Sequence, residues 1–124
     1  MTPLADAQFV LLTTFRRDGT GVPTPVWVVP VDGALGVWTP ASSGKIKRIR
    51  RSSAVTLAEC DRRGTPLGPA VPGTATVLDA AGTRRVRDAV RRKYGLLGRV
   101  LTTISGLRRR HGGATGVAIT LDPT

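Results

Sequence analysis

The stretch FVLLTTFRRDG at residues 9–19 joins an apolar, β-branched and aromatic run to an Asp-Gly pair, which is a strong hairpin signal. A second run, VPTPVWVVPV at residues 22–31, leads to another Asp-Gly and then to LGVWT at residues 35–39. Tight turns leave no room for crossover helices, so these residues predict a three-strand antiparallel meander. The second run contains three prolines, Pro23, Pro25 and Pro30. Because proline donates no ladder hydrogen bond, we expect the proline-bearing ends of this second strand to lie at an edge of the sheet or at a bulge.

The rest of the chain alternates between helical and strand patterns. Residues 42–51 place Ile46 and Ile49 three apart among cations, which predicts a short amphipathic helix with Ser42 or Ser43 as N-cap. Residues 83–94 predict a second helix, and Gly95 stands where a C-cap belongs. The remaining expected elements are strands at 54–60 and around 73–79, a further helical pattern at 96–107, and a last strand through Val117, Ile119 and Leu121.

These elements predict a mainly β (α+β) fold, a six-stranded antiparallel split β-barrel with two or three short helices. The 124 residues are the size of one domain, so we expect a single domain over residues 1–124. No apolar run reaches the ~18–20 residues needed to span a bilayer, and the N-terminus lacks the pattern of a secretory signal. We therefore expect a soluble, cytoplasmic protein that has no membrane partner.

The charge of the chain is unusual, with a formal net charge of +11 and a sequence pI near 11.7. Such a surface attracts polyanions: nucleic acid, an anionic membrane face, or a phosphorylated or polycarboxylated small molecule. An arginine-rich composition without functional meaning is the alternative. Aromatic residues make up only 4% of the chain, and single-strand binders normally present several for stacking, so nucleic acid is the less favoured partner.

Side-chain catalysis has few candidates in this sequence. His111 and Cys60 are the only residues of their types, and the eight acidic residues are scattered. This composition argues against a hydrolase triad and against a His- or Cys-based metal site, so no catalytic residue and no metal ligand is predicted. If the protein is an enzyme, a cofactor carries the chemistry.

The most informative segment for binding is residues 39–51. Ser42, Ser43 and Gly44 stand at the start of the expected helix, where free backbone N–H groups and the positive end of the helix dipole favour an anion. The cations that follow are Lys45, Lys47, Arg48, Arg50 and Arg51. A solvated basic helix face or a nonspecific nucleic-acid patch remains an alternative interpretation.

Nearly the whole chain resembles one known family. The segments that carry the resemblance are LLTTFRRDG at 11–19, PVWVV at 25–29, VWT at 37–39, SGKIKRIR at 43–50, VTL at 55–57 and KYGL at 93–96. They resemble the split-β-barrel flavin and deazaflavin oxidoreductases, most closely the pyridoxamine-5'-phosphate-oxidase-like class that uses coenzyme F420. The N-terminus departs from the pattern, because it leaves room for at most one helical turn around residues 4–7.

The resemblance implies a homodimer with the cofactor in a groove at the dimer interface, and a small electrophilic molecule as hydride acceptor. It implies that Pro25, Val26 and Trp27 back the cofactor ring, and that Trp38 and Thr39 of the next strand also belong to the cofactor-binding elements. The implied holders of the phosphate and polyglutamate tail are Ser42, Ser43, Gly44, Lys45, Lys47 and Arg48. FMN is the alternative cofactor, and its single phosphate would need fewer cations.

Overall fold

The computed structural model describes the backbone at residues 4, 7–107 and 114–122, and side chains at 4, 7–95 and 114–122. His111 lies outside these ranges. The elements are, in order, β1 (Phe9–Phe15), β2 (Gly21–Val26), β3 (Val29–Val31), β4 (Ala34–Pro40), α1 (Gly44–Arg51), β5 (Ala54–Cys60), β6 (Val71–Val77), α2 (Ala80–Leu107) and β7 (Ala114–Leu121).

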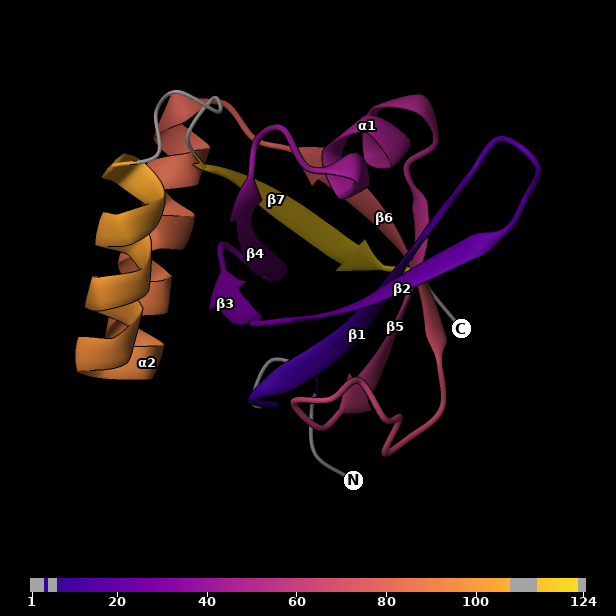
Figure 1. Ribbon diagram of the computed structural model, residues 1–124, viewed down its shortest axis with the longest axis horizontal. Coiled ribbons are helices and arrows are strands. Elements are labelled where there is room, and N and C mark those ends of the chain that lie inside the picture. The colour runs from indigo at the N-terminus through magenta and orange to yellow at the C-terminus, as the bar shows by residue number, and fades with distance from the viewer. Residues whose placement is uncertain (1–3, 5–6, 108–113, 123–124) are drawn as a thin grey trace.

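The strands form one antiparallel sheet in the order β2-β1-β5-β6-β7-β4-β3. The sheet curls into a half-barrel, with α1 across one end and α2 on the outside against β3, β4 and β7 (Figure 1). Its first and last strands, β2 and β3, follow each other in the chain. The short connection at Trp27 and Val28 therefore carries the chain between the two edges of the curled sheet.

Two apolar clusters hold these layers together. The larger fills the inside of the half-barrel and includes Val10, Leu12, Val37, Leu57 and Ile119, with Ile46 and Ile49 of α1 closing its end. The smaller lies between α2 and the outer face of β3 and β4, and its buried members are Val29, Val86, Ala89 and Val90. Burial of a side chain of this size stabilises the fold by about 1.5–3 kcal/mol.

The prediction of six strands was wrong, because residues 22–31 form two strands rather than one. β2 pairs with β1, whereas β3 pairs with β4 at the opposite edge of the sheet. The predicted meander is therefore interrupted between Val26 and Val29. The expectation from the prolines was right, since Pro23 and Pro25 lie on one edge strand and Pro30 on the other.

The helices follow the sequence pattern with one addition. α1 begins at Gly44 and buries Ile46 and Ile49 as expected. α2 extends through both predicted helical segments, and at Gly95 its backbone leaves helical geometry with φ 59° and ψ −132°. Beyond this glycine the second half runs back beside the first (Figure 1). No helix among the described residues has both the length and the apolar content needed to cross a membrane.

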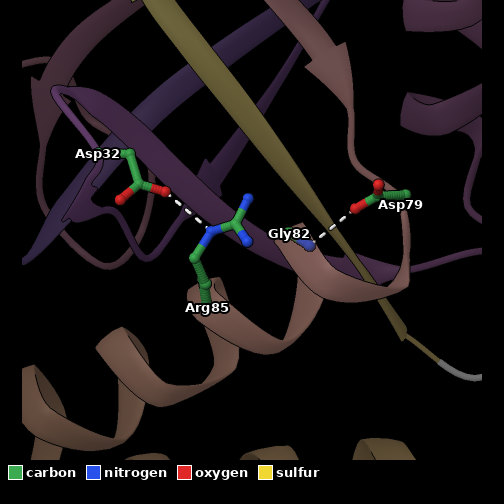
Figure 2. Close-up of polar contacts among 4 residues, drawn as sticks. All are labelled: Asp32, Asp79, Gly82 and Arg85. Atoms are coloured by element: carbon green, nitrogen blue, oxygen red, sulfur yellow. Dashed lines mark hydrogen bonds and ion pairs between the residues drawn. The ribbon is translucent and has the colours of Figure 1, made fainter.

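Two carboxylates fix α2 against the sheet (Figure 2). Asp79 Oδ1 accepts a hydrogen bond from the Gly82 N–H at 2.8 Å, which caps the helix start. Asp32 lies in the turn between β3 and β4 at φ 51°, and its carboxylate pairs with Arg85 of α2 at 2.9 Å. Both partners of this ion pair are largely exposed, so the pair contributes at most about 1 kcal/mol.

Candidate functional site

The start of α1 partly matches the predicted anion site. Ser43 occupies the N-cap position, with extended backbone and no capping hydrogen bond from its side chain. Its N–H is not free as expected, because it donates to the Pro40 carbonyl at 3.1 Å. Its carbonyl accepts from the Ile46 N–H at 3.2 Å. The Ser43 hydroxyl is thus left available for another group.

Two buried hydroxyls, one just before this helix and one at its N-cap, have no hydrogen-bond partner among the described residues. They are Thr39 Oγ1, at the end of β4, and Ser43 Oγ. Thr39 is only 3% exposed, so its hydroxyl has no ready access to bulk water. An unsatisfied buried polar group costs about 1–3 kcal/mol, so a ligand that bonds to these oxygens would recover that free energy.

Basic side chains line the flank of α1 that faces β1. Arg48 Nε donates to Thr14 Oγ1 at 2.6 Å, and Arg51 donates to the Phe15 carbonyl. The guanidinium of Arg48 also lies over Gly44, where an added Cβ would stand 2.8 Å from Arg48 Nη1. Glycine at this position therefore leaves room for the arginine beside the helix start.

Lys45 shows the electrostatic consequence of this crowding. Burial lowers the pKa of its ammonium from the ordinary value, and the positive charge of Arg48 lowers it further. The first turn of α1 contains no acidic residue to offset this repulsion. A bound anion would favour the charged form of Lys45 and raise its pKa again.

The cofactor-binding residues predicted on and between the strands lie in different environments. Trp27 and Trp38 both pack into the cluster beneath α2, on the outer face of the sheet. The Trp38 Nε1–H is buried there without a partner among the described residues. Thr39 is the next residue on the same strand, so its side chain points to the opposite face, towards the inside of the half-barrel. The side chains of Trp38 and Thr39 therefore cannot both contact the same face of a ligand.

The other predicted residues also divide. Pro25 is exposed on edge strand β2, while Val26 is buried in the main core. Ser42, just before α1, and Lys47 on it are exposed, whereas Ser43, Lys45 and Arg48 are half-buried. The residues expected to bind the phosphate and tail thus lie within one short segment, residues 42–48, and those expected to back the ring lie on two faces of the sheet.

Sequence reasoning missed two residues that organise these groups. Thr14 is 1% exposed and accepts the hydrogen bond from Arg48. The only sequence signal for Thr14 was a threonine within an apolar strand. Because threonine is common in strands, this signal does not mark it as a functional residue. Tyr94 was considered only as part of the predicted helix and of the family resemblance, and its ring stacks on Trp27 with centroids 4.0 Å apart.

Sequence comparison finds no matching protein-family model and no matching curated protein. Comparison of the structure does find similar folds. A conserved hypothetical protein from Mycobacterium tuberculosis is 22% identical, with a TM-score of 0.69 over 94% of this chain and 74% of that one. An FAD-binding protein from Mesorhizobium loti is 17% identical, with a TM-score of 0.64 over 97% of this chain and 83% of that one.

Two further solved structures show what other proteins with this fold do. The heme storage protein HutZ from Vibrio cholerae is 8% identical, with a TM-score of 0.68 over 94% of this chain and 83% of that one. A protein from Clostridium acetobutylicum is related to general stress protein 26, of the pyridoxinephosphate oxidase family. It is 15% identical, with a TM-score of 0.62 over 93% of this chain and 75% of that one. The chain therefore shares the split-barrel fold of the pyridoxinephosphate oxidase family and of these flavin- and heme-binding proteins.

Proposed function

We propose that this protein binds an anionic flavin-type cofactor at the start of α1 and acts as an oxidoreductase on a small-molecule acceptor. One observation carries the proposal: the strand end and helix start at residues 39–48 hold two buried hydroxyls without a partner among the described residues, Thr39 and Ser43, and two cations that repel each other, Lys45 and Arg48. Hydroxyl donors, ammonium and guanidinium are the groups that proteins use to hold phosphate. The FAD-binding protein with a similar fold supports the choice of a flavin.

Each residue would have a separate role in holding the anion. Thr39 and Ser43 would donate hydrogen bonds from their hydroxyls, and Lys45 would supply charge that the neighbouring Arg48 now repels. Thr14 would keep Arg48 oriented through the 2.6 Å hydrogen bond. When bound, a flavin or deazaflavin supplies hydride transfer, so the chain needs to contribute only orientation and electrostatics.

The number of basic side chains on α1 bears on which cofactor binds. FMN carries one phosphate, but α1 presents four basic side chains, Lys45, Lys47, Arg48 and Arg51, besides Arg50, which lies beside β6. This surplus supports a cofactor with several negative charges, and coenzyme F420 with its polyglutamate tail is the second candidate. FMN remains the candidate that the flavin-binding relatives of this fold support better.

A second copy of the chain is the partner we propose for the outer face of β1, which the loop after β5 covers only in part: a Cβ at Gly64 would lie 3.6 Å from Leu11, and Ala58 and Cys60 are each 4% exposed. Phe9, Leu11, Thr13 and Phe15 alternate with buried residues along this strand and are half-buried. Their neighbours in register, on β2 and β5, are Gly21, Pro23, Pro25, Thr56, Ala58 and Cys60. None of these ten strand residues is charged in a chain of net charge +11, and α2 packs over β3, β4 and β7 instead. An uncharged face on so basic a protein favours self-association.

Parallel titrations with FMN, FAD, coenzyme F420, heme and a DNA duplex would test the cofactor proposal. Quenching of the two tryptophans, Trp27 and Trp38, provides the signal. We expect saturable binding of a flavin or deazaflavin and only weak, salt-sensitive binding of DNA. Tighter binding of heme or DNA than of every flavin-type ligand would refute it. A higher affinity for coenzyme F420 than for FMN would decide between the two candidates.

A further inference from the structure

A groove of about 470 Å³ opens on the other flank of α1, away from Thr14 and the proposed cofactor residues. Its walls are α1, the second half of β6, and the two residues that lead from β6 into α2. The lining residues are Ile49, Arg50, Ala75, Thr76, Val77, Leu78 and Asp79. We refer to this space as the α1–β6 groove. Cavities of this size accommodate small organic molecules.

The two flanks of α1 face different strands. Arg48 and Arg51 form hydrogen bonds with β1, whereas Arg50 lines the groove beside β6. The buried residues Ile46 and Ile49 lie between these flanks and face the core. A ligand in the groove would therefore bind apart from a cofactor held by Lys45 and Arg48.

The groove combines an apolar floor with charged groups. Ile49 and Ala75 are each 3% exposed, and Val77 and Leu78 are half-buried beside them. Arg50 is exposed and pairs with no acidic group among the described residues. Asp79 also lines the groove, where one of its oxygens already caps α2 through Gly82 (Figure 2). No ion pair joins Arg50 to Asp79, so both charges can meet a ligand.

We propose that the α1–β6 groove binds a small aromatic or aliphatic carboxylate that carries a hydrogen-bond donor at its far end. The carboxylate would pair with Arg50, since arginine and carboxylate groups match in geometry and charge. The apolar body would cover Val77 and Leu78, and the donor would meet the Asp79 carboxylate. An anion at the Asp79 end would be repelled, which sets the direction of the ligand. This site goes beyond the proposed function, because it does not depend on a cofactor.

Calorimetric titration with 4-hydroxyphenylacetate would test this proposal. Phenylacetate lacks the donor and 4-hydroxyphenethyl alcohol lacks the carboxylate, and we expect each to bind at least about fivefold more weakly. Arg50→Gln should weaken binding of 4-hydroxyphenylacetate about tenfold and remove its advantage over the alcohol. Thr76→Trp, at an exposed position in the groove, should block binding while leaving the core unchanged.

Arg17→Gln is the matched control, because it removes one exposed charge from the hairpin between β1 and β2, outside the groove. Its affinity for 4-hydroxyphenylacetate should equal that of the unaltered protein. Three results would overturn the proposal: no saturable binding, an equal loss with Arg17→Gln and Arg50→Gln, or full affinity in folded Thr76→Trp. Because none of these titrations includes a cofactor, failure here would leave the flavin proposal standing.

Discussion

The indole of Trp27 lies flat on the phenol ring of Tyr94, with ring centroids 4.0 Å apart and planes 12° from parallel. The Tyr94 hydroxyl also donates to the Gln8 carbonyl at 2.8 Å and lies 3.2 Å from the Val28 carbonyl. One side chain of α2 thereby holds the connection between the two edge strands. The integrity of the half-barrel and the docking of α2 are thus coupled through this contact.

The first prediction concerns the titration of Tyr94, the single tyrosine of the chain. Burial raises the pKa of its phenol above the ordinary value. A raised folded-state pKa means that the contribution of Tyr94 to stability is complete below the unfolded value of about 10. It is lost as the pH rises through the folded value. Ultraviolet titration should show a single late transition, and an ordinary phenol pKa would contradict the burial.

The second prediction concerns Lys93, whose ammonium donates to the carbonyls of Ala7 and Val28 at 2.7 Å each. Lys93→Met keeps the apolar stem and removes these charge-assisted bonds, so we expect the free energy of unfolding to fall by about 3 kcal/mol. Arg92→Met, at the exposed neighbouring position, should change it by less than about 0.5 kcal/mol. Equal effects in chemical denaturation would mean that Lys93 does not anchor these carbonyls.

Local patterns predicted most elements of this fold but not the division of its second strand. β5 has the predicted bounds, 54–60, although its burial alternates only in part, since Leu57 and Ala58 are both buried. The run at residues 22–31 was misread because Trp27 and Val28 are strong strand formers, so nothing local marks the break. Only the curling of the sheet, which brings its two edges together, explains why the chain leaves one edge and joins the other.

The candidate site shows the same limit of local reasoning. Lys45 and Arg48 were predicted from charge at a helix start, which is a local feature. The buried environment of Thr39 Oγ1 depends on α1 closing the end of the half-barrel, and the contact between Arg48 and Thr14 joins residues 34 positions apart. Pairings over such distances do not follow from the residue types themselves.

The third prediction separates two effects at the start of α2. Asp79→Ala removes the cap of the Gly82 N–H and should lower the free energy of unfolding by about 1 kcal/mol. Gly82→Ala gains about 1 kcal/mol of helix propensity, but its Cβ would lie 2.9 Å from Leu78 Cβ in a buried position. Overpacking of this kind costs about 1–3 kcal/mol, so we expect net destabilisation. A higher melting temperature for Gly82→Ala would show that the helix start adjusts freely.

The fourth prediction tests the proposed self-association through the outer face of β1. Leu11→Glu places a charge on the outer face of β1, beside Gly64 of the loop after β5, and should yield a folded monomer in light scattering, because a buried unpaired carboxylate is costly at an interface. Leu121→Glu, at a position 44% exposed near the end of β7, is the matched control and should leave the mass unchanged. If the unaltered protein is itself monomeric, or if Leu11→Glu remains associated, another surface or none forms the contact.

The fifth prediction distinguishes a built anion site from a generally basic surface. Lys45→Gln and Arg48→Gln should each weaken binding of the flavin-type cofactor by about 1–3 kcal/mol, the range for hydrogen bonds to charged groups. Arg84→Gln removes the same charge from an exposed position on α2 and should cost less than about 1 kcal/mol.

Thr14→Val should weaken cofactor binding through Arg48, since it removes the acceptor of the 2.6 Å hydrogen bond and leaves the net charge unaltered. Comparable losses for Lys45→Gln, Arg48→Gln and Arg84→Gln, with none for Thr14→Val, would show that bulk charge alone attracts the ligand. If only Lys45→Gln, Arg48→Gln and Thr14→Val lose cofactor affinity, binding depends on the specific arrangement of Thr14, Lys45 and Arg48.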